Sequence, residues 1–240
     1  KAGTAEYTEG DLYVFEVGGE VAAALRQMAN RYNTTLSNIV LSIYFLLMKQ
    51  VSDQDDICIG MAHANRDHPD VEGLIGFFVN ILVIRVRFDD DTELDGLIRQ
   101  VVNNTLEGLK YAYYPFELLV EKLCKERYAV RNPLVNVTYS FQNFQDVNVG
   151  LENAAGGDTE DDHNELEFSF YQHGRQTKTS KSDLHLIVVE HNGGLRFRFE
   201  YTALLQRASM QQLAGTMRNL LLKAGHAGLT HKNSAHHEVI

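Results

Sequence analysis

Hydrophobic residues recur every three or four positions in several stretches of the chain, which is the spacing of one face of an α-helix. The predicted helices cover residues 20–32, 36–47, 93–110, 209–222 and a segment that starts at Pro115. A proline fits the first turn of that segment because the N–H group it lacks has no partner within a helix at that position. The 93–110 stretch has the most regular spacing and gives the clearest helix.

The ends of these helices are predicted from residues that cap backbone groups. Thr34 or Thr35 can accept a hydrogen bond from the free N–H groups of the second helix. The run from Asp89 to Thr92 can do the same for the third, and Ser209 for the last. We expect the last helix to end at Gly225, because glycine commonly ends helices.

Strands are predicted where apolar and polar positions alternate or where β-branched and aromatic residues form short runs. They cover residues 12–17, 56–62, 77–88, 135–141, 166–171, 184–191 and 195–201. Asn192, Gly193 and Gly194 supply the positive φ angles that a tight hairpin between the last two strands needs. The run 56–62 is apolar on both faces, which favours a position inside the sheet. The order of elements predicts α/β layers, with helices packed on a largely antiparallel or mixed sheet.

Composition narrows the classes of protein. The chain has 240 residues, of which 44% are hydrophobic, as in one or two ordinary globular domains. Its formal charge of −10 argues against binding to nucleic acid, which requires a clustered basic face. No apolar stretch reaches the ~18 residues of a membrane span. Cys58 and Cys124 lie in apolar runs, so we expect no disulfide framework and a reducing, cytoplasmic location.

No motif of a common enzyme class is present. GxSxG, P-loop and GxGxxG patterns are absent, and the ten histidines lack the spacing of metal ligands, so we expect no metal site. Cys58 is interpreted as a buried structural thiol, because nothing nearby in the sequence would stabilise a thiolate. His185 alternates with Leu184 and Leu186 along a strand. A surface histidine or a hydrogen-bonded core histidine is therefore favoured over a catalytic base.

Three ordered motifs nevertheless give the chain a recognisable signature. They are Asp56-Ile57-Cys58-Ile59-Gly60 with Asn65-Arg66, Ile75-Gly76-Phe77-Phe78-Val79-Asn80 and Arg85; Tyr114-Pro115-Phe116-Glu117; and Arg127 followed by Arg131-Asn132-Pro133-Leu134. In order and spacing they resemble the C-terminal half of the condensation domains of nonribosomal peptide synthetases. The resemblance covers about residues 10–223. Phe-Phe-Val-Asn favours ordinary peptide condensation over epimerization or heterocyclization.

The resemblance implies a chloramphenicol-acetyltransferase-like lobe and a division of the chain. Residues 1–225 would form the C-terminal lobe, with a latch-like crossover at 142–182 that reaches the other lobe. Residues 226–240 are expected to be a disordered tail. A complete domain joins two substrates, carried on the phosphopantetheine arms of carrier proteins, in a tunnel between its lobes. No cofactor would bind this chain directly.

Site residues follow from the same resemblance. The family's His-His-x-x-x-Asp-Gly motif belongs to the N-terminal lobe and is absent here, so no catalytic residue is expected in this fragment. The residues expected to line the tunnel are Gly76, Phe77, Phe78 and Asn80. For each of them a purely structural role is the alternative, and a tunnel-lining Asn80 would tolerate alanine at a cost of no more than about 1 kcal/mol in stability. The residues expected to fix helix and loop positions are Asp56, Arg66, Arg85, Pro115, Phe116, Glu117, Arg127, Asn132 and Pro133.

The expected function is therefore that of one lobe of a two-lobe enzyme. The parent protein would form peptide bonds between carrier-bound thioesters, and the isolated chain would be inactive. Expected partners are an N-terminal lobe, peptidyl or acyl carrier proteins, an adjacent adenylation domain and, through the crossover, a second copy in a strand-exchanged dimer. Two alternatives remain: a non-catalytic scaffold that binds carrier proteins or another lobe, and a fragment of an acyltransferase that uses coenzyme A.

Overall fold

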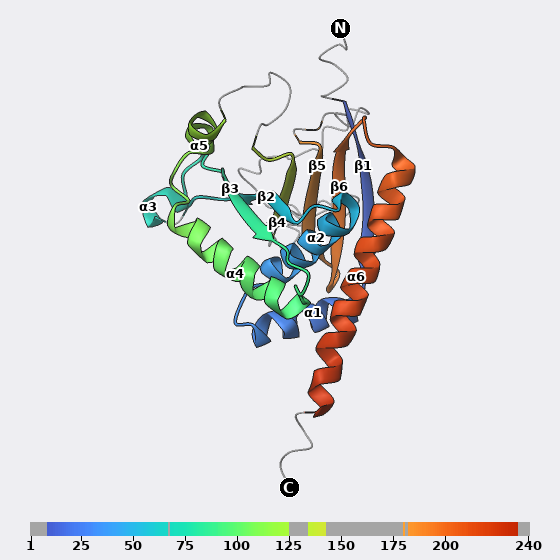
Figure 1. Ribbon diagram of the computed structural model, residues 1–240. Helices are drawn as coiled ribbons and strands as arrows, with labels where there is room; N and C mark the ends of the chain where they lie inside the picture. Colours follow the sequence, from blue (N-terminus) through green and yellow to red (C-terminus); the bar gives the residue numbers. More distant parts are fainter. Residues whose placement is uncertain (1–8, 67, 125–133, 143–179, 181, 235–240) are drawn as a thin grey trace, which may run out of the picture.

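The computed structural model describes residues 9–66, 68–124, 134–142, 180 and 182–234 (Figure 1). The strands are β1 (Gly10–Val17), β2 (Asp56–His63), β3 (Asn80–Arg87), β4 (Val137–Gln142), β5 (Leu184–His191) and β6 (Gly194–Thr202). The helices are α1 (Gly19–Arg31), α2 (Leu36–Ser52), α3 (Pro69–Glu72), α4 (Leu94–Lys110), α5 (Phe116–Leu123) and α6 (Arg207–Ser234). The strand predicted at 166–171 lies outside the described residues, as does nearly all of the predicted crossover.

The six strands form one sheet in the order β1-β6-β5-β4-β2-β3. The pairs β5–β4 and β4–β2 are parallel, and the other three pairs are antiparallel. The sheet is therefore mixed. β2 pairs with β3 on one side and β4 on the other, so its predicted interior position is confirmed.

One face of the sheet is covered by α1, α2, α4 and α6 (Figure 1). The side chains that alternate along β6 bury Leu195, Phe197, Phe199 and Tyr201 against these helices. Phe15 of β1 stacks on Phe197, with 4.8 Å between ring centroids. α2 packs against α1, α4, α6 and β2, which explains why eleven of its seventeen residues are buried. Burial of apolar side chains is the main force that holds the layers together.

Predicted helix and hairpin ends are confirmed at two places. The hydroxyl of Thr35 caps α2 by accepting a hydrogen bond of 3.2 Å from the backbone N–H of Asn38. Asn192 and Gly193 have φ angles of 48° and 75°, as the hairpin between β5 and β6 requires.

Two other helix ends differ from prediction. α4 begins after Glu93, which makes no side-chain cap, because Thr92 accepts instead from the backbone N–H of Asp89 in the preceding turn. α6 begins at Arg207, before the predicted cap Ser209. It also continues through Gly225 and Gly228 to Ser234, since each glycine inside an otherwise helical segment costs only about 1 kcal/mol. The predicted tail is therefore helical over 226–234, and its remainder lies outside the described residues.

No single helix in the described part of the chain is long and apolar enough to cross a membrane. α1 and α2 pass that test of length and composition only as a pair, bent by 103° at the break between them.

Candidate functional site

Arg66 organises the part of the first motif that runs from Ile75 to Asn80. Its guanidinium donates to the backbone carbonyls of Val71 and Leu74 at 2.7 Å and of Gly76 at 3.2 Å. It also lies over the Phe78 ring, 4.4 Å from the ring centroid. A planar guanidinium can direct several donors at once, so one side chain fixes the whole connection between α3 and β3. These contacts are what a residue that fixes loop position would make, and that role for Arg66 stays a prediction.

This clamp explains why β3 begins later than predicted. The sequence predicted a strand from Phe77, since Phe-Phe-Val is a β-prone run, but the strand starts at Asn80. The bonds to Arg66 fix the backbone just before this run. The Phe78 ring packs against the Arg66 guanidinium, while Phe77 is 91% exposed.

Asn80 performs a similar task for the connection between α4 and α5. Its Nδ2 donates to the carbonyls of Ala112 at 2.7 Å and Tyr114 at 2.8 Å. Its Oδ1 accepts from the backbone N–H of Phe116 at 3.1 Å. The side-chain amide therefore makes three hydrogen bonds to a segment more than thirty residues away. Asn80 joins residues 74–79 to residues 111–115.

The two clamped connections expose a group of large apolar side chains, which we call the apolar patch. Its members are Leu74, Ile75, Phe77, Val79, Tyr111 and Tyr113. Exposed apolar surface held on fixed backbone is typical of an interaction site rather than of a disordered loop. The two connections that carry the patch run at the β3 edge of the sheet, beside α3 and α5 (Figure 1).

The second motif lies at the start of α5. Pro115 is the N-cap of this helix, Phe116 is buried with 7% of its surface exposed, and Glu117 lies exposed in the first turn. The structural roles predicted for the first two fit these positions. Arg127, Asn132 and Pro133 lie outside the described residues.

Asp56 and Arg85 face each other across β2 and β3, although they are 29 residues apart in the sequence. Arg85 donates from Nε to one carboxylate oxygen at 2.7 Å and from a terminal nitrogen to the other at 2.5 Å. Arg87 lies 3.4 Å from the same carboxylate. The hydrogen bond from Arg85 is the main reason that the pKa of Asp56 lies below its usual value. Burial raises the pKa of the neighbouring Cys58 thiol, which fits the predicted structural thiol.

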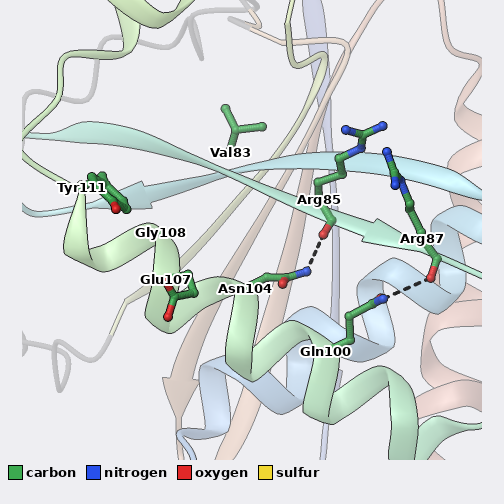
Figure 2. Close-up of a pocket in the computed structure, with 8 residues that line it drawn as sticks. All are labelled: Val83, Arg85, Arg87, Gln100, Asn104, Glu107, Gly108 and Tyr111. Carbon is green, nitrogen blue, oxygen red and sulfur yellow. Dashed lines mark hydrogen bonds between the residues drawn. The ribbon is translucent and has the colours of Figure 1, made fainter.

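A shallow groove of about 460 Å³ runs between β3 and α4 (Figure 2). Asn104 Nδ2 donates to the carbonyl of Arg85 at 2.6 Å, and Gln100 Nε2 donates to that of Arg87 at 3.2 Å. Figure 2 shows the two guanidinium groups turned away from α4. These amides occupy outward carbonyls of an edge strand and so block that stretch from pairing with another strand. Neither Gln100 nor Asn104 was predicted to have a role, and their i, i+4 spacing beside an edge strand was the available signal.

No group of three or more histidine, cysteine, aspartate or glutamate side chains that could hold a metal ion occurs among the described residues.

Comparison with known proteins assigns the family. A family model described as "Condensation domain" matches residues 3–235. The chain belongs to the condensation-domain family. It is 31% identical over 207 residues to tyrocidine synthase 2 of Brevibacillus parabrevis. The aligned region covers 86% of this chain and 5% of that synthase. It is 33% identical over 217 residues to bacitracin synthase 3 of Bacillus licheniformis, covering 90% of the chain and 3% of that synthase. The chain therefore spans only a small part of the length of these relatives.

Solved structures support the fold of this condensation-family chain. The holo form of AB3403, a four-domain nonribosomal peptide synthetase bound to AMP and glycine, superposes with a TM-score of 0.77 at 21% identity. The match covers 91% of this chain and 17% of that one. The condensation domain of the monacolin K polyketide synthase MokA gives a TM-score of 0.69 at 17% identity over 92% of this chain and 47% of that one. The predicted α/β fold, a chloramphenicol-acetyltransferase-like lobe with a mixed sheet covered by helices, is confirmed.

Proposed function

We propose that this chain is the C-terminal lobe of a peptide-bond-forming condensation domain. It acts with an N-terminal lobe that supplies the catalytic histidine. Carrier proteins deliver aminoacyl or peptidyl thioesters on phosphopantetheine arms, and an adenylation domain adjoins the pair of lobes. The tunnel between the lobes is lined on this side by the segment from Gly76 to Asn80.

The observation that carries this proposal is the apolar patch. The sheet and its helices already form a closed core, yet Ile75 is fully exposed and Phe77 is 91% exposed. Leaving such side chains in water forgoes about 1.5–3 kcal/mol each. Arg66 and Asn80 hold the backbone beneath them in one conformation, which lowers the entropy cost of binding a partner. A second lobe that covers the patch accounts for both features.

The missing chemistry supports a two-lobe enzyme. The sequence contains no His-His-x-x-x-Asp-Gly motif, and neither of the two polar residues that hold the patch can replace its histidine as a base. Arg66 is committed to backbone carbonyls and Asn80 to the 111–116 connection. The residues of this lobe therefore shape and orient, while the proton transfer belongs to the partner.

The proposal is tested by binding of the N-terminal lobe encoded with this chain, measured by calorimetry. Phe77→Ser and Ile75→Ser should each weaken binding by about tenfold or more, because truncating a central apolar contact costs at least about 1.4 kcal/mol. Val51→Ser is the matched control, since Val51 is 55% exposed at the end of α2 and lies outside the patch. Equal binding by all four proteins would show that the patch is not the lobe interface.

A further inference from the structure

Polar side chains gather on the face of the sheet opposite the helices, away from the apolar patch. β4, β5 and β6 are neighbours, and His185 of β5 lies directly across from Thr138 of β4 and Glu200 of β6. Ser140 lies two residues beyond Thr138 and so points to the same face. The register alone therefore places a hydroxyl, an imidazole and a carboxylate on three adjacent strands.

The distances place the imidazole ring of His185 between the Ser140 hydroxyl and the Glu200 carboxylate. The Ser140 Oγ lies 3.0 Å from Nε2 of His185, which is hydrogen-bond distance. The other ring nitrogen, Nδ1, lies 3.8 Å from Oε2 of Glu200, beyond a hydrogen bond but within ion-pair range. The second oxygen of this carboxylate accepts from Arg198 at 3.2 Å, which restrains it.

The position of the carboxylate bears on which nitrogen of the His185 ring carries the proton. A negative charge beside Nδ1 favours the tautomer that carries its proton there, and this leaves the lone pair of Nε2 to accept from the Ser140 hydroxyl. A hydroxyl that donates to an imidazole oriented by a carboxylate is the arrangement by which serine nucleophiles are activated. The side chains of His185 and Glu200 are 28% and 36% exposed, so small reactants can reach them.

We propose that Ser140 is a nucleophile that accepts acyl groups from activated esters and thioesters, with His185 as its base and Glu200 as the group that holds the imidazole. This activity is separate from the proposed peptide-bond formation, because none of the three residues belongs to the apolar patch. It needs no second lobe. The partial exposure of His185 and Glu200 favours small, reactive acyl donors.

The reaction balances without any further reagent. The Ser140 O–H bond breaks as its proton moves to Nε2 of His185, and Oγ forms a bond to the acyl carbon. The bond between that carbon and the leaving sulfur or oxygen then breaks, and the leaving atom takes the proton from Nε2. Water repeats the sequence to release the carboxylic acid.

The first experiment treats the whole chain with a fluorophosphonate probe and with p-nitrophenyl acetate. Mass spectrometry should find the probe on Ser140, and Ser140→Ala should abolish labelling. His185→Gln should slow both reactions by about a hundredfold, the usual contribution of a general base. Ser52→Ala, which removes a hydroxyl at the end of α2, is the control and should react like the unmodified chain. Labelling that is absent, or that persists in Ser140→Ala at the same rate, overturns the proposal.

A second variant keeps the inference testable even if Ser140→Ala is unstable. In Ser140→Cys the new thiol should react with iodoacetamide at pH 6 at least about tenfold faster than Cys58, because an imidazole partner lowers the pKa of a thiol. Adding His185→Gln should remove that advantage. Reactivity at position 140 that does not depend on His185 would show that the three groups form only a structural network.

Discussion

Replacing Asn80 with alanine tests the clamp between the two loops of the apolar patch. The variant loses the donors to Ala112 and Tyr114 and the acceptor of the Phe116 N–H. Each net hydrogen bond contributes about 0.5–1.5 kcal/mol. Asn80 is partly buried, so water replaces some of these bonds, and we expect the free energy of unfolding to fall by about 2–3 kcal/mol. This exceeds the limit of about 1 kcal/mol that a residue serving only to line a tunnel would show.

The assay is urea unfolding followed by circular dichroism, with Asn103→Ala as the matched control. Asn103 is exposed on α4, and alanine suits a helix, so this variant should match or exceed the stability of the unmodified chain. Asn80→Asp separates donor loss from cavity formation. It keeps an acceptor for Phe116 but sets a carboxylate against two carbonyl oxygens, and it should be at least as unstable as the alanine variant. A loss below about 0.5 kcal/mol for Asn80→Ala would refute the clamp.

Further predictions concern other parts of the chain. Arg66→Met should speed hydrogen exchange of the amides between residues 71 and 78 by about tenfold, with Arg99→Met as the control, because three carbonyls lose their donor. Tyr139→Phe should cost about 1 kcal/mol, because its buried hydroxyl donates to the Ser37 carbonyl at 2.9 Å. Tyr44→Phe should be neutral or stabilising, because its hydroxyl has no partner within the described residues; the opposite ranking in thermal unfolding would contradict this. The free energy of unfolding should be retained above about pH 4 and should fall on further acidification, because the folded-state pKa values of Asp11, Asp56 and Asp95 lie below normal. Asp56→Asn should make this fall less steep. An unchanged slope in that variant would exclude a contribution from Asp56.

The periodicity of hydrophobic residues correctly predicted the strands and helices that bury one continuous apolar face against the rest of the fold. β5 was predicted with its observed bounds, and the 93–110 helix missed its start by one residue. These predictions were correct because the spacing of apolar residues along the chain determines which side of a strand or helix is buried. The start of β3 was wrong because an arginine outside the strand determines the preceding backbone, and no local pattern reports that contact.

The candidate site was also predicted only in part from the sequence. Its motifs were recognised in the sequence, but the roles of Asn80 and Arg66 depend on which distant carbonyls they reach. His185 was interpreted as a surface or hydrogen-bonded histidine, and the sequence did not reveal its bond to Ser140, 45 residues away. Only the register of β4 against β5 brings them together.

The central proposal is that this chain is one lobe of a condensation domain and that the other lobe supplies the base and half of the tunnel that peptide-bond formation needs. The most direct test mixes the isolated chain with aminoacyl-loaded donor and acceptor carrier proteins and follows dipeptidyl thioester by mass spectrometry. A complete condensation domain serves as the positive control. We predict no dipeptidyl thioester from the isolated chain and its appearance when the N-terminal lobe is added. Turnover by the isolated chain comparable to that of the complete domain would contradict the account.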